Sequence, residues 1–340
     1  MAVVQSRSMK WIIVFFLGLF IGLSSTYLWL TAQNAKLLVP LVFPSGRPLD
    51  AYTIPELSKR MYTPSTIVFD DAIATTSAYT SYNFHFLSDT KKVAGLAHIP
   101  RTTQVAAKFP VIIQLRGFVA RETYTTGVGT ARSGQVFAQN GFLTIAPDFL
   151  GYGRSDPQSS DVFEERFETY TVAANLIASI PTLTIADPNR IALWGHSNGG
   201  QIALTVLEIL GKPIPTSLWA PVSKPFPYSI LYYTDEASDS GKLLRKFLAS
   251  FEKDYDTDLY SMSRYIDRIV APMQIHQGTA DDAVPVAWTN DFVKRLQKSG
   301  KDATIFIYPG ANHNMVAPGT DSWSTAVMRD VEFFKKYLEK

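Results

Sequence analysis

The chain contains no cysteine among its 340 residues. Disulfide bonds, thiolate metal sites and a lipidated cysteine are therefore excluded, while the redox state of the compartment is left open. Histidine is scarce as well, because only five are present and no two of them have the His-x-x-x-His spacing of a metal-binding helix. We therefore expect no metal site and no cofactor.

The chain also lacks an excess of either charge. Its 32 Lys and Arg residues face 30 Asp and Glu residues, which gives a formal net charge of +2. No basic block is present, so charge gives no argument for nucleic-acid binding, and we expect no nucleic-acid partner. A hydrophobic content of 46% and a charged content of 18% are ordinary for a globular protein with one sizeable core.

One long hydrophobic run is present, at residues 11–30, and it carries no charge. Its length matches the roughly 20 residues that cross a bilayer. Arg7 and Lys10 precede it, which predicts a cytoplasmic N-terminus over residues 1–10 and an extracytoplasmic remainder. We expect a single-pass membrane protein held by a transmembrane signal anchor. Secretion after signal cleavage is the alternative, although the apolar core of a signal peptide usually has only about 7–15 residues.

The segment after this run, residues 31–64, is punctuated by prolines and holds only short apolar pieces, which predicts a tether. Residues 65–340 then form the expected catalytic domain. Alternating apolar and polar residues over 65–100 predict antiparallel strands at one edge of a sheet.

After Pro110 the pattern changes to buried strands that alternate with helices. Continuous apolar strands of this kind predict an α/β protein whose mostly parallel sheet is covered by helices on both faces. The ligand site of such a sheet lies beyond the carboxyl ends of its strands. The strands are expected at 111–115, 142–146 and 191–194, and the helices at 129–140 and 164–180.

The most informative motif is Gly-His-Ser-Asn-Gly at residues 195–199. An apolar strand leads into it and an apolar-periodic helix follows, which is the context of a nucleophile elbow. A serine at such a turn has a strained backbone and an outward-facing Oγ, and small flanking residues let strand and helix approach each other. Ser197 is therefore the predicted nucleophile.

A serine nucleophile needs a base and an acid that orients it. His313 follows a β-rich run and a Pro-Gly break, which places it on a loop at the carboxyl end of a strand. Asp281 and Asp282 lie in a similar loop between the two, so the order is Ser, Asp, His, as in α/β-hydrolases. Either aspartate fits the acid, and either one fits a cap for the helix that starts near Val284.

Backbone N–H groups near the serine complete the predicted site. Phe118 follows the first parallel strand and Asn198 follows the nucleophile, so their N–H groups are the expected oxyanion hole. The insertion at 221–263 is rich in Pro, Tyr, Phe and charge, and we expect it to form a short cap over the pocket.

These motifs together resemble the catalytic domain of the prolyl oligopeptidase family of α/β-hydrolases, over about residues 80–338. The resemblance implies an α/β-hydrolase fold and a triad of Ser197, Asp281 and His313, with the first aspartate of the pair as the acid. Two features depart from it. Arg116 stands where the wider superfamily often has His before Gly, and no Tyr-Gly-Gly-Pro segment supplies a tyrosine to the oxyanion hole.

The resemblance implies a serine hydrolase that cleaves ester or amide bonds through an acyl-enzyme. We expect a peptidase that acts on small peptides. A carboxylesterase of the same fold is the alternative, and a catalytically silent binding module is the alternative from another class. The residues do not separate a peptide from an ester substrate.

Overall fold

The computed structural model describes residues 46–102, 108–234 and 237–339. Leu49–Lys340 forms one compact unit. The predicted cytoplasmic N-terminus (1–10) and the predicted anchor (11–30) lie outside the described residues. None of the helices within the described ranges is both long enough and apolar enough to cross a membrane.

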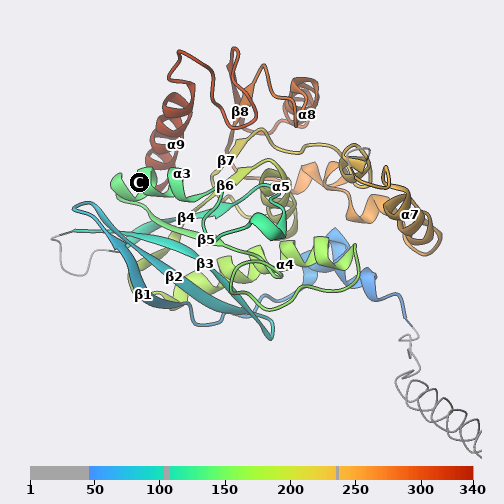
Figure 1. The fold of residues 1–340 in the computed structure, drawn as a ribbon, viewed down its shortest axis with the longest axis horizontal. Helices are drawn as coiled ribbons and strands as arrows, with labels where there is room; N and C mark the ends of the chain where they lie inside the picture. The colour runs from blue at the N-terminus through green and yellow to red at the C-terminus, as the bar shows by residue number, and fades with distance from the viewer. Residues whose placement is uncertain (1–45, 103–107, 235–236, 340) are drawn as a thin grey trace, which may run out of the picture. The chain divides into compact units, whose positions relative to one another are not determined.

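A nine-stranded sheet runs through the described part of the chain, in the order β1-β2-β3-β5-β4-β6-β7-β8-β9 (Figure 1). The first three strands and the β3–β5 pair are antiparallel, and the strands from β5 to β9 are parallel to one another. The strands are β1 (Val68–Thr75), β2 (Tyr79–Ser88), β3 (Lys91–Pro100), β4 (Phe109–Leu115), β5 (Leu143–Pro147), β6 (Ala186–His196), β7 (Thr216–Trp219), β8 (Met273–Gly278) and β9 (Ala303–Tyr308). The predicted antiparallel edge and mostly parallel sheet are confirmed.

Helices cover both faces of this sheet. In Figure 1, α3 and α9 lie together on one side and α4 lies on the other. In β4, Ile112 belongs to a buried cluster with α3 and α9, whereas Val111 and Ile113 belong to a second cluster with α4 and α5. This alternation explains why the successive residues Val111, Ile112 and Ile113 are all apolar. The helices are α2 (Ile54–Lys59), α3 (Ala131–Gln139), α4 (Glu164–Ser179), α5 (Asn198–Leu210), α6 (Tyr228–Leu231), α7 (Lys242–Asp254), α8 (Val286–Lys298) and α9 (Ser322–Leu338).

The described part of the predicted tether differs from the expectation. Leu49, Ile54 and Leu57 are buried in the core, so the compact unit begins at Leu49 and not at residue 65. The prolines of this segment predict a tether. Pro55, however, occupies the first turn of α2, where a proline is tolerated because the N–H at that position has no partner within the helix.

The predicted cap at 221–263 contains α6, α7 and short 3-10 turns. Phe251 of α7 packs 4.8 Å from Phe163 and 5.5 Å from Phe226, measured between ring centroids. It also lies 6.3 Å from Phe167 of α4. This aromatic cluster fixes the insertion beside α4, and its effect on specificity remains a prediction.

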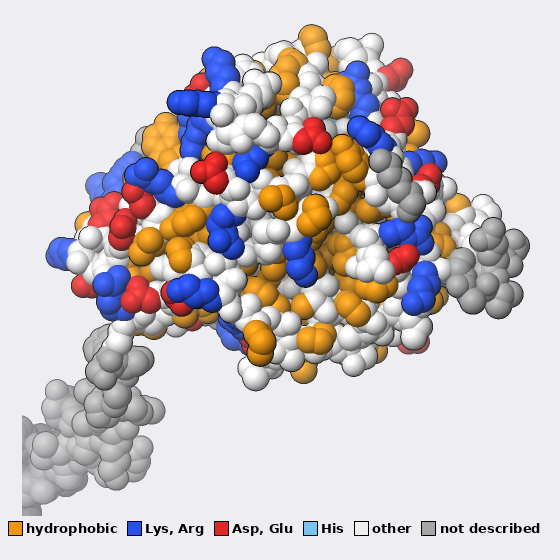
Figure 2. All heavy atoms as spheres, turned by 180° about the vertical axis from the view of Figure 1, so that it is seen from behind, with side chains coloured by type: hydrophobic (Ala, Val, Ile, Leu, Met, Phe, Trp, Pro, Cys, Tyr) orange, Lys and Arg blue, Asp and Glu red, His pale blue; other side chains and the backbone are white. Residues whose placement is uncertain are grey.

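The surface carries both charges. On the face shown in Figure 2, Lys and Arg side chains are interspersed with Asp, Glu and uncharged groups rather than gathered in a single patch. Exposed apolar side chains lie among them.

Candidate active site

Ser197 occupies the sharp turn between β6 and α5 with φ 56° and ψ −120°. A positive φ is strained for a residue with a Cβ, which is the conformation expected of a nucleophile elbow. A Cβ added at Gly199 would lie 1.9 Å from the carbonyl oxygen of Leu115, and one added at Gly195 would lie 2.6 Å from that of Gly199. The requirement for small residues on both sides of the serine is therefore confirmed.

Backbone hydrogen bonds hold this turn against the next strand. The Ser197 N–H donates to the Trp219 carbonyl at 2.9 Å, and the Ser197 carbonyl accepts from the Val222 N–H at 3.0 Å. The strained backbone is thus fixed from β7 and from the start of the 221–263 insertion.

The structure brings His313 and Asp281 together. His313 Nδ1 lies 3.0 Å from each carboxylate oxygen of Asp281, whose side chain is fully buried. Asp281 also accepts from the N–H groups of Ala283 and Val284 and from the Gln277 amide. Burial alone would raise the pKa of Asp281, but the hydrogen bonds from His313 and the Val284 N–H outweigh it and hold the pKa below its ordinary value. The carboxylate is therefore ionised at neutral pH.

The geometry distinguishes the two aspartates, because His313 hydrogen-bonds to Asp281. Asp282 is exposed, and no hydrogen bond joins it to His313 within the described ranges. The Asp281 carboxylate binds the imidazole and also accepts the N–H groups of Ala283 and Val284 in its own loop. Neither aspartate caps α8, whose N-cap residue is Pro285 with no side-chain hydrogen bond.

His196 has a role that the sequence reasoning missed. Its ring lies 4.6 Å from the His313 ring, centroid to centroid. Its Nε2 donates to the His313 carbonyl at 3.0 Å. Burial lowers the pKa of His196 to about 4, so the ring is neutral at pH 7. Only its position beside the serine in the motif hinted at this contact.

The His313 imidazole lies close to the serine turn at the edge of the sheet. His196, which contacts His313, is the residue before the serine. Within the described ranges, Ser197 Oγ forms no hydrogen bond with His313. Catalytic hydrogen bonds of this kind often tighten only when substrate binds.

The predicted oxyanion donors lie next to the serine. A Cβ added at Gly117 would lie 3.0 Å from Ser197 Cβ, so the Gly117–Phe118 peptide passes close to the nucleophile. Asn198 begins α5, where backbone N–H groups have no partner within the helix. Among the described residues, neither the Phe118 nor the Asn198 N–H donates to a protein acceptor.

Arg116 is a second residue whose role the sequence did not reveal. Its guanidinium donates to the carbonyls of Gly117, at 3.0 Å, and Asp148, at 2.8 Å. It lies over two aromatic rings that also contact each other, 4.5 Å from the centroid of Tyr124 and 4.0 Å from that of Tyr152. In a trans peptide the C=O and the next N–H point in opposite directions. By holding the Gly117 carbonyl, Arg116 therefore fixes the direction of the Phe118 N–H.

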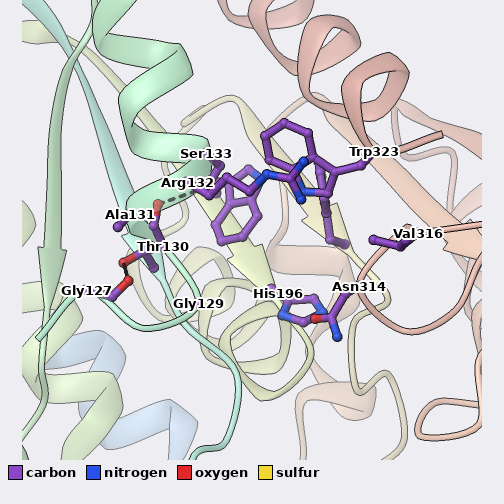
Figure 3. A pocket seen from close by; sticks show the side chains of 12 residues that line it. Gly127, Gly129, Thr130, Ala131, Arg132, Ser133, His196, Asn314, Val316 and Trp323 are labelled. Atoms are coloured by element: carbon purple, nitrogen blue, oxygen red, sulfur yellow. Dashed lines mark hydrogen bonds between the residues drawn. The ribbon is translucent and has the colours of Figure 1, made fainter. Parts of the chain in front are cut away.

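Two cavities adjoin these residues. One, of about 380 Å³, is lined by Phe118 and Asn198 among others. The other, of about 400 Å³, is lined by His196 and Asn314. Figure 3 shows the second cavity, with Trp323 and Arg132 on the side opposite His196.

Within the described ranges, no group of three or more His, Asp or Glu side chains is arranged to hold a metal ion.

Comparison with known sequences identifies the family. The profile described as the prolyl oligopeptidase family matches residues 130–340. The chain belongs to this family. The predicted resemblance is thus confirmed over most of the expected catalytic domain, including the segments that carry Ser197, Asp281 and His313.

Individual relatives include peptidases and esterases. A putative dipeptidyl aminopeptidase of Schizosaccharomyces pombe is 25% identical over 214 residues, which cover 62% of this chain and 24% of that protein. The chain spans about a quarter of the length of the first curated relatives that it matches. Acetyl xylan esterase 1 from Thermoanaerobacterium superposes with a TM-score of 0.60 at 15% identity, covering 85% of this chain and 95% of the esterase. A puromycin-hydrolyzing peptidase of Mycobacterium tuberculosis gives 0.59 at 18% identity, covering 78% and 41%. At these identities the structural likeness establishes the α/β-hydrolase fold.

Proposed function

We propose that the protein is a serine hydrolase that cleaves ester or amide bonds through an acyl-enzyme. The observation that carries this proposal is the hydrogen-bonded Asp281–His313 pair at the same sheet edge as the strained serine turn. Membership in the prolyl oligopeptidase family supports it independently. Ser197 is the proposed nucleophile, His313 the general base and Asp281 the acid that orients it.

The proposed reaction begins when Ser197 Oγ attacks the substrate carbonyl carbon and its proton passes to His313 Nε2. Asp281 keeps the other imidazole proton on Nδ1 and stabilises the imidazolium that forms. The N–H groups of Phe118 and Asn198 donate to the developing oxyanion. His313 then gives its proton to the leaving oxygen or nitrogen, and water repeats the cycle on the acyl-enzyme. The reaction needs no cofactor.

We propose peptidase activity first, because the family and the fungal relative are peptidases by description. Carboxylesterase activity is the second candidate, supported by the esterase among the similar structures. A panel of nitrophenyl esters and dipeptide amides separates the two activities. The kcat/KM of each substrate is measured, and titration with a fluorophosphonate gives the concentration of active serine. Hydrolysis of the amides supports a peptidase, and hydrolysis of esters alone supports a carboxylesterase. A protein that neither reacts with the fluorophosphonate nor hydrolyses any substrate is the silent module, and the proposal fails.

Arg116 provides a test of the proposed oxyanion hole. Arg116→Met keeps much of the side-chain volume but removes the donor to the Gly117 carbonyl. Because the Phe118 N–H is then no longer held in place, we expect kcat to fall by about 10²-fold, the usual cost of losing one oxyanion donor, with a much smaller change in KM. A variant with normal kcat would show that this contact does not orient the peptide. Arg154→Met, at an exposed arginine that pairs with Asp70, is the matched control.

We further propose that residues 11–30 anchor the protein in a membrane and that the catalytic unit lies outside the cytoplasm. The uncharged 20-residue run and the preceding Arg7 and Lys10 support this. The full-length protein is expected to stay with membranes after a carbonate wash, because such a run inserts in an effectively irreversible way. Recovery in the soluble fraction, with a mature N-terminus close to Gln33, would instead establish a cleaved signal peptide.

A further inference from the structure

The cavity of about 380 Å³ beside the proposed oxyanion donors is lined by apolar side chains and by an arginine, Arg166, that forms no ion pair among the described residues. Both Phe118 and Asn198 line it, so a substrate held by their N–H groups is in reach of its walls. Its apolar lining is provided by Phe149, Leu150, Ile202 and the ring of Tyr152, and its charged lining includes Arg166 of α4.

Arg166 has no carboxylate within ion-pairing distance among the described residues. Its guanidinium donates instead to neutral oxygens, the Gln201 amide at 2.8 Å and the Asn198 amide at 3.5 Å. Tyr170 is a further neighbour, and burial raises the pKa of its phenol, so this group is neutral as well. Arg166 Nε is buried without any hydrogen-bond partner.

The other charged groups of the cavity form no ion pair with Arg166, although Glu165, its neighbour in the chain, favours its charged form electrostatically. Arg121 and Glu165 form a pair with each other at 3.0 Å. Arg116 is bound to two backbone carbonyls. Glu122 is exposed and lies in the 3-10 turn Arg121–Thr123.

Arg166 is partly buried, and a guanidinium in such a place is incompletely compensated when its hydrogen bonds go only to neutral oxygens. The partners of Arg166 make this worse, because Asn198 and Gln201 lie in the first turn of α5, at the positive end of its dipole. Both effects are relieved when an anion enters, and a planar carboxylate matches the donors of a guanidinium. From this geometry we propose that the cavity binds a carboxylate of the substrate through Arg166, so that the enzyme prefers substrates that carry a free carboxyl group near the scissile bond.

This inference rests on the proposed hydrolase function and names its substrate class. Two substrate pairs test it, one for each side of the scissile bond. On the acyl side, the p-nitrophenyl monoester of adipic acid is compared with p-nitrophenyl hexanoate. On the leaving-group side, 4-acetoxybenzoic acid is compared with its methyl ester. We expect the carboxylated member of at least one pair to have the higher kcat/KM, by about 10-fold or more.

Variants of Arg166 assign the preference to this residue. The selectivity ratio is the kcat/KM of the carboxylated substrate divided by that of its neutral partner. Arg166→Gln keeps hydrogen-bonding groups but removes the charge, and it should lower this ratio at least 10-fold. Arg166→Lys keeps the charge and should retain most of the ratio, which also provides a test if the glutamine variant does not fold. Arg154→Gln is the control and should keep the wild-type ratio, because Arg154 is paired with Asp70.

A readout independent of turnover separates this inference from the proposed function. Adipate binding, measured by calorimetry, should be detectable for the wild type and lost in Arg166→Gln. If fluorophosphonate labels the enzyme and neutral esters are cleaved, but neither pair shows a carboxylate preference, this inference alone is overturned. If the protein shows neither labelling nor turnover, the proposed function fails. If adipate binding is absent, or is equal in the wild type and the variant, the carboxylate site is overturned as well.

Discussion

Ser197→Ala is expected to abolish fluorophosphonate labelling and to lower kcat on the best substrate by a factor on the order of 10⁶, the loss seen when the nucleophile of a serine hydrolase is removed. The reason is that Ser197 occupies the strained turn between β6 and α5, the position of a nucleophile elbow. Mass spectrometry of the labelled protein and single-turnover kinetics measure the two effects. The substitution removes one oxygen and leaves the backbone hydrogen bonds of the turn in place, so the melting temperature should hardly change.

A second serine serves as the control for this result. Ser223 is buried in the insertion after β7, and its hydroxyl has no partner among the described side chains. Ser223→Ala should therefore label as the wild type does. Labelling that persists in Ser197→Ala would remove the serine from the role of nucleophile and with it the proposed mechanism.

Asp281→Asn should lower kcat by about 10⁴-fold, whereas Asp282→Asn should change it only a few-fold. An asparagine can still accept the N–H groups of Ala283 and Val284, so the loop keeps its shape. Its amide N–H, however, donates to His313 Nδ1, so the single proton of the neutral imidazole moves to Nε2. Nε2 then cannot accept the proton of Ser197. The imidazole is then held in the wrong tautomer.

The pH dependence of kcat/KM for the two variants distinguishes a tautomer effect from a loss of stability. Asp282→Asn should keep the wild-type profile, while Asp281→Asn should be impaired at every pH at which it remains folded by circular dichroism. The opposite ranking of the two variants would transfer the acid role to Asp282.

Features that depend on local conformation were predictable from the chain. The elbow is one, because a Cβ added at Gly195 would clash with Gly199 of the same motif. The parallel strands are another, because burial on both faces requires a continuous apolar run such as that of β4. The order of serine, aspartate and histidine also followed, since parallel strands bring their carboxyl ends to one edge.

The start of the compact unit was not predictable in the same way. The prolines of 31–64 predict a tether. A proline pattern, however, does not show whether the apolar side chains near it pack into the core of the domain. Leu49, Ile54 and Leu57 are buried because the core leaves room for them, which depends on the packing of elements distant in sequence.

By itself, then, the sequence determined the strand-turn-helix that strains Ser197, the α/β architecture and the order of the candidate triad, because each can be read from the residue pattern of individual strands, turns and helices. The tertiary structure decided which side chains meet: Asp281 rather than Asp282 beside His313, His196 against the same imidazole, Arg116 on the Gly117 carbonyl and Arg166 without a carboxylate. The physical reason is that most of these contacts join segments far apart in the chain. Their distances, burial and charge balance are therefore set by how the sheet and helices pack and not by any local pattern.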